Sequence, residues 1–468
     1  MTTWQAVSNS EIARPILPFL IKPYLQLGAG ASFKSENYLE LIWHLHKHHD
    51  SLAVEVKYRD SNQWQSMPIV ESEKLKIHGI KKHYRYRAIM ADMRFGKAAI
   101  YRILWRGYTV FSAEFRTPKG RGVPLRFAVV GDLADGGSAV KQVAHRLYNE
   151  HPDICIIAGD VTYKHGRVSE YLKHFFPVLN CDANDAEIGA PLMRSIPTAV
   201  AWGNHDVSIP KGDRDRSDER RCDLFGIDLF FRQPQNGPSV NLKRALLLDG
   251  DNKKYKKIPK SIGDDFLRRS NYFFQMGNAH FQVIDGNAYM NWENPELRLW
   301  LSQSLSQADC DWKFVVVHPP PFNIDKKYWC EQRIRLLSSI FEQHGVDVVF
   351  SGHSHMYART HPLRFGAHAG KDGRFVQPDG QVKGSMIVDH TFKSGGRAPK
   401  GPIYVITGAG GKALGDDHSP DLHNVPNFMA QVEIENRSIT VCQIDGKNFH
   451  LRQITSQGEE IDTLALSK

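Results

Sequence analysis

The sequence predicts a mixed α/β protein built from two units, an all-β module and a larger domain in which strands alternate with helices. Two observations support this division. From residue 21 to residue 116, apolar and polar residues alternate in short runs separated by turn residues, which is typical of a β-sandwich. Beyond residue 124, continuous apolar runs alternate with helical segments, which is typical of sheets covered by helices.

The first unit ends in a compact linker, residues 117–124, which holds two prolines and two glycines. Residues of these two types interrupt strands and helices. We therefore place one domain over 1–118 and a second domain over 119–468. The clearest alternating runs of the first domain are 39–45, 53–58, 84–90 and 109–115.

The second domain begins with an apolar strand over 125–130 and a helical segment over 139–150. A strand over 154–158 and a helical segment over 170–179 repeat this alternation. Residues from about 207 to 270 lack clear periodicity and are rich in positive charge, so we expect a charged insertion running over the surface. Further strands are expected at 198–201, 272–275, 280–284, 314–317, 346–350 and 403–407, and further helices at 297–307 and 331–344.

Composition limits the classes of protein that the chain can form. The 468 residues are 41% hydrophobic and 24% charged, an ordinary globular balance that suits one small and one large domain. The net charge of +9 favours anionic ligands of any kind. No run reaches the ~20 apolar residues of a membrane span. The apolar run 16–21 is interrupted by Pro18 and makes a poor signal peptide, so we expect a cytoplasmic location.

Five short segments place potential metal-binding side chains directly after apolar runs. Because strand ends meet at one edge of a sheet, these side chains are expected to converge there. Each segment alone is weak evidence for a metal site, since Gly-Asp after a strand usually forms only a turn. All five together are rarely expected by chance. The segments are Gly131-Asp132, Gly159-Asp160-Val161-Thr162-Tyr163, Gly203-Asn204-His205-Asp206, His318 and Gly352-His353-Ser354-His355.

Seven of these side chains carry donor atoms that suit metal ions. They comprise two carboxylates, one phenol, one carboxamide and three imidazoles, enough to hold two cations side by side. A pair of metal ions is the usual means of hydrolysing phosphate esters, so the sequence predicts a binuclear metal-dependent hydrolase of such esters. The predicted donors are Asp132, Asp160, Tyr163, Asn204, His318, His353 and His355.

These segments resemble the calcineurin-like metallophosphoesterase superfamily, and specifically its purple acid phosphatase branch. The general superfamily pattern begins Asp-x-His, but position 134 is Ala, so that imidazole is absent. Tyr163 instead completes the Gly-Asp-x-x-Tyr motif of purple acid phosphatases. A phenolate can replace the missing imidazole, and its hard anionic oxygen favours a ferric ion. The similarity extends to Lys22-Pro23-Tyr24-Leu25, Trp300, 352–359, 402–404 and 408–411.

The resemblance implies an architecture and a role for each donor. The architecture is an N-terminal fibronectin-like β-sandwich followed by a metallophosphoesterase β-sandwich flanked by helices, in αββα order. One metal site would hold Fe(III) and the other a divalent Fe, Zn or Mn ion. His205 would stay unligated and face the substrate. In this assignment Asp132, Tyr163 and His355 hold the ferric ion, Asp160 bridges both ions, and Asn204, His318 and His353 hold the second ion.

The favoured activity is hydrolysis of a small phosphomonoester, in which metal-bound hydroxide attacks phosphorus and His205 stabilises or protonates the departing alkoxide. Two alternatives stay open. The same site could act as a phosphodiesterase or nucleotide pyrophosphatase, or the chain could be a metal-dependent interaction protein. The basic run 253–257 is too weak a signal to predict nucleic-acid binding, and no membrane partner is expected. The sequence does not indicate an oligomeric state.

Three further features receive structural interpretations. Four histidines, at 44, 46, 48 and 49, fall in a β module without nearby Cys or carboxylate partners, and we expect a solvated strand face there. Residues 408–411 follow a strand but lack the Lys-Ser/Thr ending of a P-loop, which favours a structural turn near the metals. Asp206 is expected to brace the metal loop by hydrogen bonding.

Overall fold

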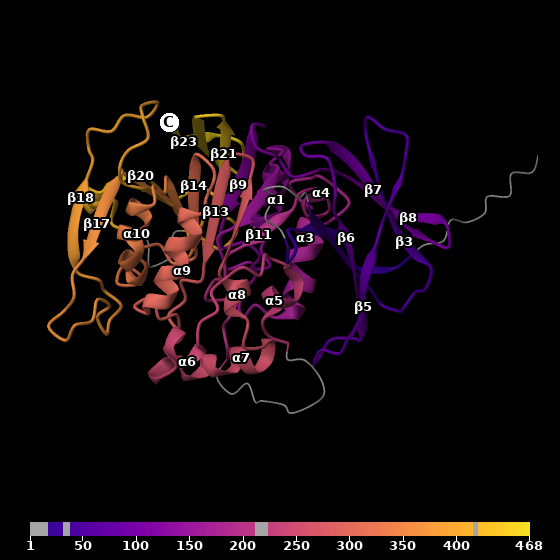
Figure 1. Ribbon diagram of the computed structural model, residues 1–468, viewed down its shortest axis with the longest axis horizontal. Helices are drawn as coiled ribbons and strands as arrows, with labels where there is room; N and C mark the ends of the chain where they lie inside the picture. The colour runs from indigo at the N-terminus through magenta and orange to yellow at the C-terminus, as the bar shows by residue number, and fades with distance from the viewer. Residues whose placement is uncertain (1–16, 31–37, 211–222, 415–419) are drawn as a thin grey trace, which may run out of the picture.

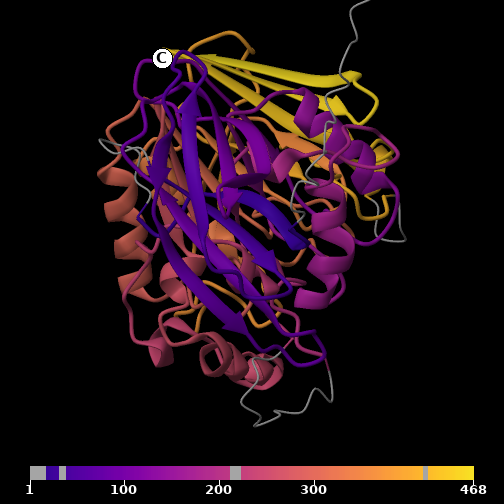
Figure 2. The same ribbon diagram turned by 90° about the vertical axis from the view of Figure 1, so that its right-hand side faces the viewer.

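The structure, a computed structural model, describes residues 17–30, 38–210, 223–414 and 420–468. Its strands form one ten-stranded, one seven-stranded, one four-stranded and one two-stranded sheet. The two large sheets pack face to face, and helices cover their outer flanks (Figures 1 and 2). The prediction of a mixed α/β fold with a β-rich N-terminal region is confirmed.

The N-terminal region is built from two layers of antiparallel strands. Alternate residues of its strands are buried, as in β3 and β7, because successive side chains point to opposite faces. Trp43, Val54 and Tyr101 from the two layers share one apolar core. One layer contains β1 (Phe19–Gln26), β2 (Leu39–Leu45), β6 (His83–Met90) and β5 (Ile69–Leu75), and the other contains β4 (Gln65–Met67), β3 (Leu52–Tyr58), β7 (Ala98–Trp105) and β8 (Tyr108–Arg116).

The ten-stranded sheet runs through both parts of the chain. At its centre β9 (Leu125–Val130), β10 (Ile154–Ile157) and β11 (Thr198–Val200) are parallel. The next strand is β1, which pairs with β11 through Gln26 and Thr198. The layer β1-β2-β6-β5 of the N-terminal region therefore continues this sheet. Its other edge is formed by β21 (Ser438–Asp445), β22 (Asn448–Thr455) and β23 (Glu460–Ser467).

The seven-stranded sheet forms the opposing layer, and aromatic side chains fill the space between the two sheets. Phe127 of β9 lies with its ring centroid 5.0 Å from that of Phe281 and 5.1 Å from that of Phe314. In spatial order the sheet contains β12 (Tyr272–Met276), β13 (Ala279–Ile284), β14 (Trp312–Val317), β15 (Val348–Ser351), β19 (Ile403–Thr407), β16 (Tyr357–Thr360) and β20 (Met429–Glu433), while β17 (Leu363–Ala367) and β18 (Gly384–Val388) form a separate hairpin.

The two longest described helices cover the sheets with apolar faces. α1 (Ala139–Asn149) buries Val140, Val143, Ala144 and Leu147, which recur at helical spacing along one face. α9 (Pro295–Ser306) begins at Asn294, whose side chain accepts hydrogen bonds from two backbone N–H groups of the first turn. The expected helix over 170–179 contains α2 (Val168–Glu170), the π-helical η1 (Tyr171–Phe175) and α3 (Phe176–Leu179), and α4 (Leu192–Ser195) follows.

Two predictions of secondary structure need correction. The insertion at 207–270, expected to run over the surface, contains several helices of four to seven residues in its described part, and the first of them buries Ile227, Leu229 and Phe230. Helices this short give no periodic pattern, and packing stabilises them. The helix expected over 331–344 is split into the 3-10 helix η3 (Arg333–Leu337) and α10 (Ser338–Gln343). The insertion contains α5 (Gly226–Phe230), α6 (Leu242–Ala245), η2 (Gly250–Lys256), α7 (Lys257–Ile262) and α8 (Leu267–Ser270); a last 3-10 helix, η4, spans Leu422–Asn424.

Across the described residues, no helix combines the length and the apolar character that crossing a bilayer requires.

The expectation of a solvated histidine face is wrong for His44. Its side chain is completely buried, and its ring lies 5.2 Å from that of His83 and 5.7 Å from that of Phe230 in α5. Neither ring nitrogen has a hydrogen-bond partner in the described part of the chain. Burial, with the positive charges of His83 and Arg85, holds the pKa of His44 well below its usual value.

The buried imidazole of His44 predicts acid sensitivity. The unfolded chain takes up a proton at this residue near pH 6.5, whereas the folded chain resists it, so the free energy of unfolding falls as the pH drops below about 6.5. His44 contributes at most about 1.4 kcal/mol per pH unit to the slope of the free energy of unfolding against pH. His44→Phe should reduce this slope in urea titrations between pH 7 and pH 5. His48→Phe, at an exposed position, is the control, and equal slopes for all three proteins would refute the prediction.

Candidate metal centre

All five predicted segments follow the carboxyl ends of strands that meet at one edge of the two large sheets. The parallel strands β9, β10 and β11 lead to Asp132, Asp160 and Asn204 in the first sheet. In the second sheet, the parallel strands β14 and β15 lead to His318 and His353. Because the two sheets face each other, residues more than two hundred positions apart are brought together at this edge.

Three of the predicted donors form one group. The Tyr163 hydroxyl donates a hydrogen bond to Asp132 Oδ1 at 2.8 Å and lies 3.4 Å from His355 Nε2. His355 Nε2 is also 3.6 Å from Asp132 Oδ1. A phenol oxygen, a carboxylate oxygen and an imidazole nitrogen therefore point into one small space, which is a donor set that suits a hard metal ion.

A second group forms around His318. Its Nε2 lies 3.0 Å from Asn204 Oδ1 and 3.3 Å from Asp160 Oδ1. Its Nδ1 donates to the backbone carbonyl of Ala158 at 2.8 Å, which fixes the ring and leaves Nε2 directed at the site. The ring of His353 lies 5.0 Å from that of His318. The structure thus brings together the three residues predicted to hold the second ion.

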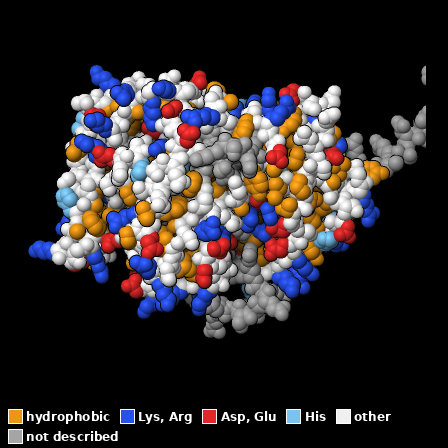
Figure 3. All heavy atoms as spheres, in the orientation of Figure 1, with side chains coloured by type: hydrophobic (Ala, Val, Ile, Leu, Met, Phe, Trp, Pro, Cys, Tyr) orange, Lys and Arg blue, Asp and Glu red, His pale blue; other side chains and the backbone are white. Residues whose placement is uncertain are grey.

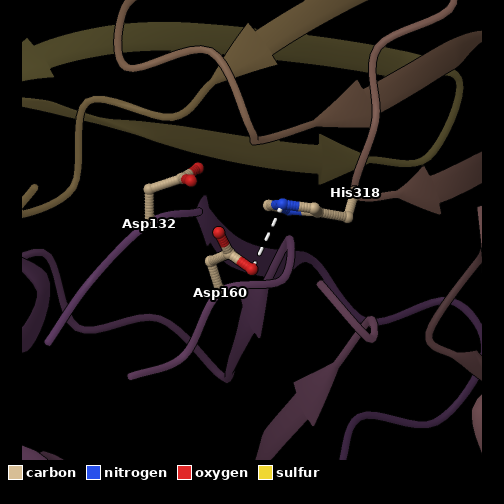
Figure 4. Close-up of side chains that lie close together, drawn as sticks. All are labelled: Asp132, Asp160 and His318. Atoms are coloured by element: carbon tan, nitrogen blue, oxygen red, sulfur yellow. Dashed lines mark ion pairs between the residues drawn. The ribbon is translucent and has the colours of Figure 1, made fainter. Parts of the chain in front are cut away.

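Asp160 lies between the two groups. Donor atoms of Asp132, Asp160 and His318 all lie within 4.8 Å of one another, and Figure 4 shows these side chains directed toward a common space. The other carboxylate oxygen of Asp160, Oδ2, is 4.0 Å from His205 Nε2. One carboxylate can offer an oxygen to each of two ions, and the position of Asp160 fits that bridging role.

The electrostatics of this cluster fit bound cations. Burial raises the pKa of Asp132 to about 7. Burial and the neighbouring Asp132 raise the pKa of Tyr163 well above its usual value, so its phenolate needs a nearby positive charge. Burial also acts to raise the pKa of Asp160, but the charge and hydrogen bond of His318 and the charges of His205 and His353 together outweigh burial, so the pKa is lowered. His353 Nε2 is buried, has Glu331 Oε2 3.4 Å away and makes no hydrogen bond of normal geometry among the described residues, so it can donate its lone pair to a metal.

The backbone of three predicted ligands is held in an unusual conformation. Asp132, Asp160 and His353 have φ angles of 60°, 48° and 69°, in the left-handed region that residues with a side chain rarely adopt. Such strain persists where surrounding contacts fix it, and it concentrates at functional sites. Here the Asp132 carboxylate accepts a hydrogen bond from the N–H of His353 at 2.8 Å, which ties the two sheets together at the site.

Gly203 permits a close backbone approach in the centre. A Cβ atom at this position would lie 2.2 Å from both the backbone nitrogen and Oδ1 of Asp160. We expect Gly203→Ala to lower the free energy of unfolding by about 1–3 kcal/mol and to reduce metal content, because the Asp160 carboxylate must move. Urea denaturation and elemental analysis measure both effects. Gly366→Ala, where nothing lies within 4 Å of the added atom, is the control; two variants with equal stability and equal metal content would contradict the prediction.

His205 and Asp206 follow Asn204 but occupy different environments. His205 Nδ1 donates to the carbonyl of Lys164 at 2.7 Å, its Nε2 faces the site, and about a third of its side chain is exposed. Asp206 is fully buried and accepts hydrogen bonds from the N–H groups of Gly203 and Val161 at 2.9 and 3.0 Å. The prediction that Asp206 braces the metal loop is confirmed.

The sequence did not predict two side chains close to His353. Glu331 Oε2 lies 3.4 Å from His353 Nε2, and the Tyr328 ring lies 4.1 Å from the His353 ring. Both residues are on the long connection after His318. They carry no spacing signal, because only the path of that connection brings them to the site.

The glycine-rich segment 408–411 packs against the metal loops, as expected for a structural turn. A Cβ atom on Gly408 would lie 2.2 Å from the carbonyl oxygen of Ser354 and 2.9 Å from Asp132 Oδ2. This close packing requires glycine at position 408.

Comparison with known proteins agrees with this geometry. Residues 125–357, which include all five metal segments, match the family model described as calcineurin-like phosphoesterase. The chain contains a calcineurin-like phosphoesterase domain. Its relatives include purple acid phosphatase 23 of Arabidopsis thaliana, which is 25% identical over 315 residues, or 63% of this chain and 54% of the relative. An uncharacterized protein of Mycobacterium tuberculosis is 26% identical over 337 residues, or 67% of this chain and 55% of that protein.

The fold of this phosphoesterase chain is similar to that of a solved purple acid phosphatase. The enzyme PPD1 from yellow lupin seeds superposes with a TM-score of 0.67 at 15% identity, over 97% of this chain and 75% of the lupin chain. This likeness supports the architecture. The chain spans about half the length of the curated relatives it matches.

Proposed function

We propose that this phosphoesterase chain hydrolyses phosphate esters at a binuclear metal centre, with a preference for small phosphomonoesters. The observation that supports the proposal most is the convergence of donors from five separate segments around Asp160. When bound, two metal ions neutralise the phosphate charge and make bound water acidic enough to attack phosphorus. Fe(III) at the Tyr163 group fits the hard phenolate donor, and a divalent ion fits the group with Asn204 and two imidazoles.

The residues of the chain supply positioning and proton transfer. Ala158 fixes the His318 ring, and Asp206 fixes the loop that carries Asn204. His205 is oriented by the Lys164 carbonyl, to which Nδ1 donates, and in its imidazolium form it carries a second proton on Nε2, on the side of Asp160. From this position His205 can donate a proton to the oxygen of the departing alcohol.

Removing the imidazole of His205 should slow the hydrolysis of esters of weakly acidic alcohols more than the hydrolysis of esters of acidic phenols. A poor leaving group needs a proton in the transition state, whereas a good one does not. For His205→Ala we expect losses in kcat of about 10²–10³-fold for an alkyl phosphate and about tenfold or less for p-nitrophenyl phosphate. Equal losses for both esters would exclude a role in protonating the leaving group. His165→Ala, on the same side of the site, is the control.

One observation favours a second candidate, phosphodiester hydrolysis. Glu331 places a carboxylate next to His353. The pKa of Glu331 is lowered because the hydrogen bond and charge of His353, with the charges of Arg333 and His318, together outweigh the effect of burial. A negative charge beside the second ion repels a dianionic monoester more than a monoanionic diester.

A panel of substrates tests the proposed function. Purified protein with a measured metal content is assayed with p-nitrophenyl phosphate, bis-p-nitrophenyl phosphate and a nucleoside triphosphate. The proposal predicts the highest kcat/KM for the monoester. Higher kcat/KM for the diester would support the second candidate, and metal-loaded protein without hydrolysis of any ester would refute both.

A further inference from the structure

A cavity of about 750 Å³ lies beside the predicted metal centre, and the proposed function does not use it. Its walls come from the helical insertion around α6, from the segment after β13 and from the loop 374–378. Figure 3 shows Lys and Arg side chains gathered along the lower edge of the molecule, over α6 and α7. The charged side chains that line the cavity are Lys243, Arg244, Arg333 and Arg374 with Asp249 and Glu293.

Two of the cationic groups that line this cavity are not paired with a carboxylate among the described residues. Glu293 accepts hydrogen bonds from two backbone N–H groups of the neighbouring loop, at 2.9 and 2.7 Å, and these bonds hold the loop in place. Arg244 pairs with Glu296 at 2.6 Å. Within the described ranges, Lys243 and Arg333 form no ion pair. These two cationic groups are available to an anion in the cavity.

One wall of the cavity adjoins the predicted metal site through a short segment of chain. Arg333 lies two residues after Glu331, whose carboxylate is 3.4 Å from Nε2 of the predicted ligand His353. Its guanidinium lies against the loop opposite, since a Cβ atom on Gly380 would be 3.4 Å from it. Arg333 therefore lines the cavity on the same segment of chain that carries Glu331 to the metal centre.

The opposite wall is tied to the other side of the metal site. Ala288 and Met290 line the cavity and follow Asn287. Asn287 Nδ2 donates to the backbone carbonyl of Trp202 at 3.0 Å, and Trp202 leads directly into the loop that carries Asn204. Short segments of chain therefore connect both walls of the cavity to loops of the metal site.

The lining of the cavity also has an apolar part. Trp292, Met290 and Leu246 contribute to it, and the indole of Trp292 is fixed because its Nε1 donates to the carbonyl of Asp285 at 2.8 Å. A rigid apolar surface with a few charged groups suits the organic part of a small molecule.

We propose that this cavity binds the part of the substrate that remains after phosphate is removed, and that this part carries an anionic group of its own. The inference rests on the proposed function, because it assigns the cavity to the same substrate. Lys243 and Arg333 bind the second anionic group, and the apolar wall holds the organic portion. The substrate class is thus small organic molecules with two or more phosphate or other anionic groups.

The experiment measures binding without turnover. Isothermal titration calorimetry on the full-length, metal-loaded protein compares α,β-methylene-ADP, which has several anionic oxygens and an organic part, with phenylphosphonate, which has one anionic group. For Lys243→Gln/Arg333→Gln we expect Kd to rise about tenfold or more for the nucleotide analogue and less than about threefold for phenylphosphonate. Lys256→Gln/Lys260→Gln removes the same charge from the same insertion outside the cavity, and its Kd values should change less than about twofold.

Three results would overturn the inference: equal weakening of both probes by the cavity variant, equal weakening of the analogue by the control variant, or no preference of the unmodified protein for the analogue. The phosphatase assay separates this test from the proposed function. Absent hydrolysis together with the expected binding pattern would reject only the hydrolytic activity. Measured hydrolysis together with any of the three contrary results would reject only the cavity assignment.

Discussion

Replacing Asp160 by Ala should remove both bound metal ions and lower kcat/KM for p-nitrophenyl phosphate by more than about a hundredfold. Loss of a residue that merely supports a metal ligand costs 10–100-fold, and a bridging ligand contributes to both ions at once. Asp160 is buried, its Oδ1 lies 3.3 Å from His318 Nε2, and its Oδ2 faces His205. Elemental analysis after purification and the initial rate of hydrolysis measure the two effects.

The control for Asp160→Ala is a buried carboxylate that lies away from the metal edge. Asp347 accepts a hydrogen bond from the Lys313 N–H at 2.9 Å and pairs with Lys468, at the opposite end of β14 and β15. Asp347→Ala should lose stability but keep its metal ions and its activity at a temperature where it is folded. Near-normal turnover or metal content in Asp160→Ala would refute the bridging role.

Tyr163→Phe should bleach the metal-loaded protein. If Fe(III) occupies the group of Asp132, Tyr163 and His355, charge transfer from the phenolate to iron gives the protein a visible colour. The substitution removes the only phenol oxygen of that group and leaves the ring in place, so iron content should fall as well. Absorption spectra and iron analysis of the two proteins measure these changes.

Tyr404→Phe tests whether the loss is specific. Its buried hydroxyl donates to Ser338 Oγ at 3.2 Å, far along the chain from the metal loops, so its removal should leave the colour intact. Persistent colour in Tyr163→Phe, or a colourless unmodified protein that contains iron, would contradict the assignment of Fe(III) to this group.

The residues that make up the site could be predicted because the potential metal ligands directly follow the ends of strands. Asp132, Asp160 and His318 each follow an apolar run, and such runs form parallel strands whose carboxyl ends share one edge. The residues of the site could therefore be predicted from the sequence. The distances between their donor atoms could not, because they depend on how the two sheets pack.

Features that depend on long-range packing could not be predicted. His44 is buried because α5 of the insertion packs Phe230 against it, and nothing near residue 44 in the sequence indicates this contact. The continuation of the large sheet from β11 into β1 joins Thr198 to Gln26 across a predicted domain boundary. Glu331 reaches His353 only through the path of an irregular connection.

Anomalous X-ray diffraction from crystals of the metal-loaded protein would locate the bound ions. We expect two anomalous peaks that share the Asp160 carboxylate, one coordinated by Asp132, Tyr163 and His355 and the other by Asn204, His318 and His353. Data collected on both sides of the iron absorption edge should assign iron to the peak next to Tyr163. A single peak, or peaks that Tyr163 and Asp160 do not coordinate, would contradict this expectation.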